Sequence, residues 1–232
     1  MYLSKLAVDV TSREFRRDYA DVREMHRTVM SAFSDVTDTA PARQAHAVLW
    51  RLDNAQRGFT QYVQSCSQPD WQRLPTGYLT SPPQVRSLQP VLEAIAPGRR
   101  FAFRMVANPT RTITRTGTGP RPDGRRPQGR NVALRKPDDQ TRWLVRQAER
   151  CGFAIPTGTN GQPDVAPSPC PTSIGCRRPG DSGPITIEPV RFEGHLIVTD
   201  PTAFTTAIRD GIGRAKAYGC GMISLAPART AM

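Results

Sequence analysis

The sequence has few of the residues that most enzymes use for metal or nucleophilic chemistry. Its 232 residues include three histidines and five scattered cysteines, with no Cys-x-x-Cys pair, so the common structural zinc motifs are excluded. There is also no Gly-Lys-Ser/Thr phosphate loop, no nucleophilic serine elbow and no pair of catalytic carboxylates. The sequence therefore predicts neither a metal site nor a cofactor.

Long apolar runs are missing as well. No stretch reaches the ~18 apolar residues that a membrane span requires, and residues 1–10 lack the pattern of a signal peptide. An odd number of scattered cysteines is typical of a reducing compartment. We therefore expect a cytoplasmic protein with no membrane partner.

Acidic residues are outnumbered, and lysine is rare. Lys and Arg total 32 against 20 Asp and Glu, for a formal charge of +12 and a pI near 10.4. So positive a chain points to a polyanionic partner. Guanidinium groups fork onto phosphate and stack on bases, although a GC-rich coding sequence would also favour arginine over lysine.

The hydrophobic pattern predicts an α+β fold made of two tandem ferredoxin-like (RRM-like) domains. The first is expected at residues 1–107, where Asp21 caps a helix. Its expected strands are 2–10, 46–53, 59–66 and 100–107, and its expected helices are 22–33 and 85–96.

The second domain is expected at residues 131–232, after a basic loop at 108–130. Its expected elements are a strand at 131–135, a helix from Asp138 or Asp139 to Arg150, a hairpin at 185–198 turning at Glu193–His195, a helix from Asp200 and a strand at 222–226. The proline-rich stretch 156–184 is expected to be a loop without packed structure.

His26 is the strongest candidate for catalysis. His46 and His195 are expected to be solvated residues at the start of a strand and in a turn, whereas His26 falls within the apolar face of its helix. It is therefore either a hydrogen-bonded core histidine or a proton-transfer group. Arg23 and Arg27 flank it, and guanidinium groups beside an imidazole suit RNA self-cleavage, where the 2′-hydroxyl is the nucleophile and no metal is needed.

A glycine-rich segment at 211–221 is the second candidate. Glycines let a backbone approach a polyanion closely, and Lys216 adds a charge; a flexible turn is the alternative interpretation. The expected RNA-binding residues here are Gly211, Gly213, Arg214, Lys216, Gly219 and Gly221.

Arginines elsewhere form two further groups. One helix carries a stripe at a four-residue spacing, and residues 108–136 hold a concentration of cations that either grips an RNA stem or is simply solvated. The candidates are Arg142, Arg146 and Arg150 in the stripe, and Arg111, Arg115, Arg130 and Arg135 in the basic segment.

Several segments, in order, resemble the CasE family, the endoribonucleases that process CRISPR RNA in type I-E Cascade. The matching segments are Met1–Leu6, Glu24–Thr28, Leu49–Leu52, Phe101–Arg104, Ala107–Pro109, Phe192–Gly194 and, most specifically, Gly211–Pro227. The resemblance spans nearly the whole chain.

This resemblance implies two ferredoxin-like domains and a single metal-independent cut at the 3′ base of the CRISPR repeat hairpin, by attack of a 2′-hydroxyl. The products would be a 5′-hydroxyl and a cyclic or 3′-phosphate, and the protein would stay on the guide beside other Cascade subunits, chiefly the guide-RNA backbone subunit. The family's catalytic histidine falls on His26. Where some relatives have a tyrosine, this chain has Arg23, which suits charge stabilisation better than proton transfer.

Two other functions would share the basic charge. A non-catalytic RRM-like RNA-binding protein would use His26 as a core residue, and an arginine-rich ribosome-associated protein would not need the His26–Arg27 pair. Binding that weakens with salt is common to all three, so cleavage is what distinguishes them.

Overall fold

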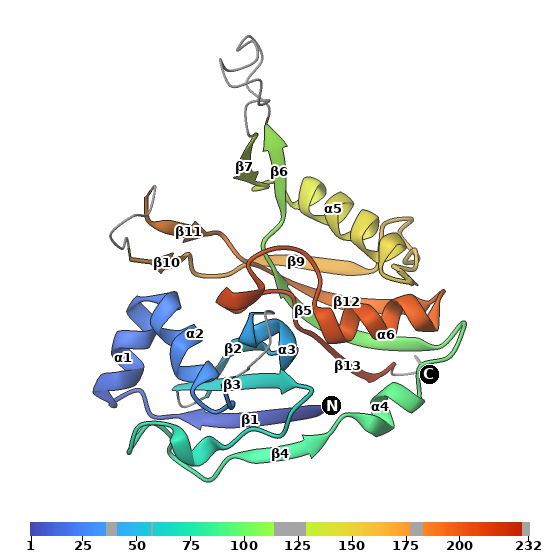
Figure 1. Ribbon diagram of the computed structural model, residues 1–232. Coiled ribbons are helices and arrows are strands. Elements are labelled where there is room, and N and C mark those ends of the chain that lie inside the picture. Colours follow the sequence, from blue (N-terminus) through green and yellow to red (C-terminus); the bar gives the residue numbers. More distant parts are fainter. Residues whose placement is uncertain (36–40, 57, 114–128, 177–182, 229–232) are drawn as a thin grey trace, which may run out of the picture.

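The computed structural model describes residues 1–35, 41–56, 58–113, 129–176 and 183–228. These residues form two large antiparallel sheets, each with its own core, and two smaller two-stranded sheets (Figure 1). One large sheet comes from residues 2–87 and the other from residues 100–227. Two ferredoxin-like units are therefore confirmed. Within the described residues, no helix combines the length and apolarity needed to cross a membrane.

The first sheet has the strand order of a ferredoxin-like fold, β2-β3-β1-β4. Three helices follow β1, but only the 3-10 turn η1 (Trp71–Arg73) occupies the place of the usual second helix. The elements are β1 (Tyr2–Val8), α1 (Arg13–Ala20), α2 (Val22–Met30), α3 (Ala42–Ala45), β2 (Leu49–Ala55), β3 (Gly58–Ser65) and β4 (Gln84–Ser87).

Local signals were partly right in this unit. Asp21 caps α2 as predicted, accepting a hydrogen bond from Arg23 N at 2.9 Å. The mostly charged helix α1 was not predicted, because it buries only Phe15 and Asp18. The helix expected at 85–96 was wrong in its first half: β4 extends along β1, and only a short helix, α4 (Gln89–Glu93), follows.

The second sheet repeats the ferredoxin-like order, β13-β5-β12-β8, with β9 also pairing with β12. Helix α5 follows β5, and α6 follows β12. The elements are β5 (Arg100–Ala107), α5 (Pro137–Arg150), β8 (Phe153–Ala154), β9 (Val165–Pro169), β12 (Val190–Val198), α6 (Pro201–Asp210) and β13 (Ile223–Pro227).

Strand β5 forms where it was expected but not in the expected sheet. It pairs with β12 from Arg100 to Ala107 and with β13 on its other side. It therefore opens the second unit, whereas the sequence pattern predicted it as the last strand of the first. The physical reason is that β4 already supplies the fourth strand of the first sheet. We propose that the boundary lies between α4 and β5.

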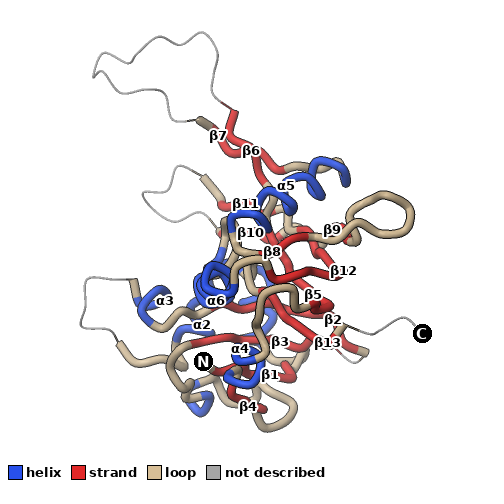
Figure 2. Tube along the Cα trace, turned by 90° about the vertical axis from the view of Figure 1, so that its right-hand side faces the viewer, coloured by secondary structure: helices blue, strands red, loops and turns tan. Residues whose placement is uncertain are grey.

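A two-stranded arm leaves the second unit between β5 and α5. It consists of β6 (Thr110–Ile113) and β7 (Arg130–Ala133), and Figure 2 shows it extending past α5, away from the first sheet. The strand expected at 131–135 belongs to this arm and not to the core sheet. Most of the expected basic loop, residues 114–128, lies outside the described residues.

The proline-rich stretch is more ordered than expected. Residues 156–184 contain β9 and β10 (Ser173–Gly175), which pairs with β11 (Ile185–Ile187). Strand β9 tolerates Pro167 and Pro169 because it lies at the sheet edge, where one side of the backbone needs no partner.

The expected turn at Glu193–His195 is also wrong, because β12 runs straight through it. Gly194 explains the continuity: a Cβ here would lie 2.2 Å from the carbonyl oxygen of Asp164 and 2.8 Å from Val165 Cα. Glycine therefore lets β9 approach β12 in mid-strand.

Of the two helix starts predicted in the second unit, one is confirmed and one is wrong. Asp200 caps α6, accepting hydrogen bonds from Thr202 N and Ala203 N, with Pro201 in the first position as predicted. In α5, by contrast, Asp138 and Asp139 lie within the first turn, because the helix begins at Pro137 without a side-chain cap.

The close approach at Gly194 leads to a stability prediction. Gly194→Ala is expected to lower the free energy of unfolding by about 2–4 kcal/mol, since the added methyl forces β9 away from β12. Gly183→Ala is the matched control, because its Cβ meets nothing within 4 Å. Urea denaturation measures both, and equal midpoints for the two variants would contradict the packing described here.

Candidate active site

His26 lies on α2 with its ring half-buried. Its Nδ1 is buried and has no hydrogen-bond partner among the described residues, so the interpretation as a satisfied core histidine is not supported. The ring meets that of Tyr218 edge-on, with centroids 6.5 Å apart. Packing holds the imidazole, and no carboxylate in the described structure orients it.

This environment favours neutral imidazole. Burial, and to a smaller extent the positive charge of Arg43, lowers the pKa of His26 to about 4. Imidazolium would need an acceptor for each of two N–H groups, and Nδ1 has none. At neutral pH His26 is therefore uncharged and able to accept a proton.

Arg43 is the functional candidate that sequence reasoning missed. It lies on α3, and its guanidinium donates to the Val48 carbonyl at 3.3 Å. Burial lowers the pKa of Arg43, and the nearby Asp210 carboxylate at the end of α6 partly opposes this. A four-residue helix between two loops gives no sequence pattern that would have indicated such a residue.

Lys216 joins the same group of charges. It lies in η2 (Lys216–Tyr218), which packs against α2 and β2. Burial lowers the pKa of Lys216, as does the charge of Arg43, while Asp210 acts in the opposite direction. We call His26, Arg43, Lys216, Asp210 and Tyr218 the α2–η2 cluster.

The glycines of 211–221 lie close to protein groups. Gly219 has φ +78° and a Cβ there would lie 2.9 Å from the Trp50 ring, while Trp50 Nε1 donates to Ala217 O at 3.2 Å. The other glycines of the segment likewise approach protein groups: Gly211 meets Leu49, Gly213 meets Trp143 and Gly221 meets Ile212. Their close approach is thus to protein, and it fixes the position of Lys216.

Arg23 and Arg27 share α2 with His26 but lie in different surroundings. Arg27 is 60% exposed and forms an ion pair with Glu24. Arg23 packs against β10, where a Cβ on Gly175 would be 3.2 Å from its Cγ. The charge that acts on the His26 imidazole is that of Arg43.

The arginines expected to grip RNA are mostly exposed. Arg142, Arg146 and Arg150 follow one face of α5, and Arg142 pairs with Asp139. Arg135 is engaged by Glu188 through two hydrogen bonds of 2.8 Å. Arg214 is exposed beside η2, Arg111 and Arg130 are exposed on the arm, and Arg115 lies outside the described residues.

The arginine stripe of α5 leads toward the α2–η2 cluster. Cys151 follows Arg150 at the end of α5, and the charges of both Arg150 and Lys216 act on its thiol, whose pKa is nevertheless raised by burial. Gly213 contacts Trp143 of the same helix. The charges of Arg150, Lys216 and Arg43 therefore connect the end of α5 with His26 through pairwise interactions.

The other two histidines differ from expectation. His46 is buried at the end of α3, with Nδ1 2.7 Å from Ser67 Oγ and Nε2 3.0 Å from Ser34 O. His195 is in mid-strand, with Nδ1 2.9 Å from Asp164 Oδ2. Across the described ranges, no three His, Cys, Asp or Glu side chains gather as a metal site.

Comparisons with known proteins agree over nearly the full length. A family model described as CRISPR associated protein matches residues 1–227. The chain is 34% identical to the CRISPR-associated endoribonuclease Cse3 of Thermus thermophilus and 28% identical to the Cascade subunit CasE of Escherichia coli. Each match covers 98% of this chain and 100% of the relative.

A solved structure of Cse3 bound to a 19-nucleotide RNA has the same fold. The TM-score is 0.78 at 33% identity, and the match covers 98% of this chain and 100% of that one. The two-unit architecture is thus the one that this relative uses with RNA bound.

The electrostatics of His26 can be measured directly. In the free protein, NMR titration of the His26 imidazole is expected to give a pKa well below 6.5. Arg43→Gln should raise that pKa, because removing a nearby positive charge stabilises imidazolium. Arg27→Gln should leave it unchanged, since Arg27 is exposed and paired with Glu24; equal shifts in both variants would contradict the assignment.

Proposed function

The chain belongs to the family of CRISPR-associated proteins whose members include Cse3 and CasE, and on that premise we propose that it is a CRISPR RNA-processing endoribonuclease. It binds the hairpin of the CRISPR repeat in precursor RNA and cuts once at the 3′ base of the stem. It then stays on the mature guide as a subunit of Cascade in antiviral defence, beside the guide-RNA backbone subunit.

The observation that carries this proposal is the half-buried His26 imidazole, whose Nδ1 has no partner among the described residues, in one cluster with the cations Arg43 and Lys216. A general base must be uncharged before it acts, and the lowered pKa of His26 provides this. Arg43 and Lys216 lie in the same cluster, where burial strengthens their action on an anion. A base and nearby cations are the groups required to transfer a phosphoryl group from the 5′-oxygen to the 2′-oxygen within RNA.

The proposed reaction needs no metal, because the attacking group is the RNA's own 2′-hydroxyl. His26 accepts its proton, the 2′-oxygen bonds to phosphorus, and the bond from phosphorus to the 5′-oxygen breaks. The 5′-oxygen takes up a proton from imidazolium or water, which leaves a 5′-hydroxyl and a cyclic phosphate that can open to a 3′-phosphate.

Arg43 and Lys216 stabilise the extra negative charge of the pentacoordinate phosphorane. Arg27 and Arg23 are proposed as further phosphate contacts, with Arg27 exchanging its Glu24 partner for RNA.

The hairpin stem is proposed to lie along α5 and the arm. Arg142, Arg146 and Arg150 face solvent on one side of α5, and Arg111 and Arg130 face it on the arm. Since this path continues to Lys216, a stem held by α5 would bring its 3′ base toward His26. Arg214 and Arg135 are proposed to contact the RNA backbone beside this path.

Cleavage tests the proposed function. The wild type is expected to cut the cognate hairpin in EDTA, and His26→Ala to bind it normally but cut at least about 100-fold more slowly. A hairpin with deoxyribose immediately upstream of the cut should be bound and left intact. Single-turnover gels and filter binding measure both properties.

Two results would reject this account. If the wild type binds and never cuts, the protein is a non-catalytic RNA-binding module of the same fold. If His26→Ala cuts as fast as the wild type, the reaction uses other residues.

The stem-binding path gives a separate prediction. Arg146→Gln should weaken binding of cognate and unrelated hairpins by similar factors, and lower the slope of log K against log salt by about 1. Arg86→Gln on β4 is the control, because β4 is the edge of the sheet farthest from α5 (Figure 1). An unchanged slope for Arg146→Gln would place the stem elsewhere.

A further inference from the structure

A cavity of about 160 Å³ opens between the two units beside the α2–η2 cluster. Its wall comes from α1, α2, β2, β3, the chain between β9 and β10, and η2. Its volume suits a planar ring, since a cavity of about 150 Å³ accommodates benzene in another protein. None of the functions discussed above uses it.

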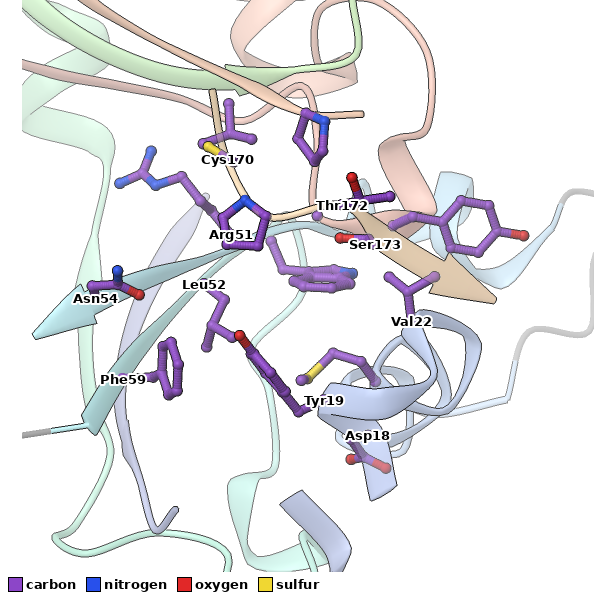
Figure 3. A pocket seen from close by; sticks show the side chains of 17 residues that line it. Asp18, Tyr19, Val22, Arg51, Leu52, Asn54, Phe59, Cys170, Thr172 and Ser173 are labelled. Carbon is purple, nitrogen blue, oxygen red and sulfur yellow. The ribbon is translucent and has the colours of Figure 1, made fainter. Parts of the chain in front are cut away.

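One wall of the cavity is an exposed aromatic ring. Tyr19 at the end of α1 is 52% exposed, and its ring is held against Phe59 and Phe15 at centroid distances of 5.2 and 6.0 Å. Figure 3 shows the Tyr19 side chain extending toward Leu52 and Phe59. A ring fixed in place and partly open to solvent is a surface on which a nucleobase can stack.

Other walls carry neutral polar groups. Asn54 at the end of β2 supplies an amide, and Thr172 and Ser173 supply hydroxyls from the opposite unit (Figure 3). Amide and hydroxyl groups hydrogen-bond to base edges. The cavity therefore combines a stacking surface with groups that can bind the edge of a planar heterocycle.

The cavity adjoins His26. Tyr218 lines it and also meets the His26 ring, 6.5 Å away, and Met25, the residue before His26, is part of its wall. Among the described residues that line it, none belongs to α5, the helix of the proposed stem path.

The proposed reaction creates a need for such a site. Attack by a 2′-oxygen requires that this atom, the phosphorus and the 5′-oxygen be aligned, and a stacked A-form strand does not align them. One nucleotide beside the cut must therefore leave the stack, and unpaired bases in RNA complexes are commonly held on aromatic side chains.

We propose that this cavity binds the base of the nucleotide immediately downstream of the cut, stacked on Tyr19. The inference rests on the proposed function, and holding that base turns the scissile phosphate toward His26. Arg43 and Lys216 then contact the phosphate, while α5 keeps the upstream stem.

A double-mutant cycle tests the site with uncleavable RNA, which carries deoxyribose upstream of the cut. Tyr19→Leu and an abasic downstream nucleotide are each expected to weaken binding about tenfold. The two changes together should weaken binding no more than either change alone, because both remove the same stacking contact. Tyr19→Phe keeps the ring and should bind within about twofold of the wild type.

The controls separate this site from loss of folding and from failure of the cleavage proposal. Tyr2→Leu changes a half-buried tyrosine outside the cavity and should leave binding intact, and circular dichroism reports whether each variant folds. If the two losses multiply, or Tyr19→Leu binds normally, the base site is refuted. A wild type that binds but never cuts refutes the nuclease and still allows the cycle to decide the base site.

Discussion

The packing of the glycine-rich segment against Trp50 is the contact on which the site depends. Gly219 allows the chain to pass within van der Waals distance of the indole ring, and Ala217 O accepts the indole N–H. On the other side Gly221 N donates to Val106 O at 2.7 Å. A segment of the second unit is thereby fixed on the first, and Lys216 and Tyr218 come to lie beside α2.

That packing has an electrostatic consequence. It gathers Arg43, Lys216 and His26 where water is partly excluded, with Asp210 as the acidic group that acts on both Arg43 and Lys216. Burial lowers the pKa of all three basic groups, and the charge of Arg43 lowers the pKa of His26 and Lys216 further, so this arrangement of like charges destabilises the free protein. The negative charge of a phosphodiester relieves that repulsion. The arrangement that destabilises the free protein therefore favours binding of an RNA phosphate at the α2–η2 cluster. The neutral state of His26 follows mainly from burial of its ring, and the charge of Arg43 adds to it.

The sequence predicted the two ferredoxin-like units, the caps of α2 and α6, and His26 as the candidate base, because these rest on local patterns or motifs. It misplaced β5, since an apolar strand does not encode which sheet it joins. It predicted a turn at Gly194 and a loop at the prolines of β9. Both predictions were wrong because these residues are accommodated by the pairing of β9 with β12, which a local pattern does not show. It missed Arg43, Tyr218 and the Tyr19 cavity, which arise only when segments from both units meet.

A crystal structure with the uncleavable hairpin tests the central claim most directly. The account predicts that oxygens of the scissile phosphate lie within hydrogen-bond distance, about 3 Å, of Arg43 and Lys216, with the upstream 2′-carbon facing the His26 ring. A scissile phosphate that lies away from the α2–η2 cluster, with Arg43 and His26 contacting no RNA, would contradict it.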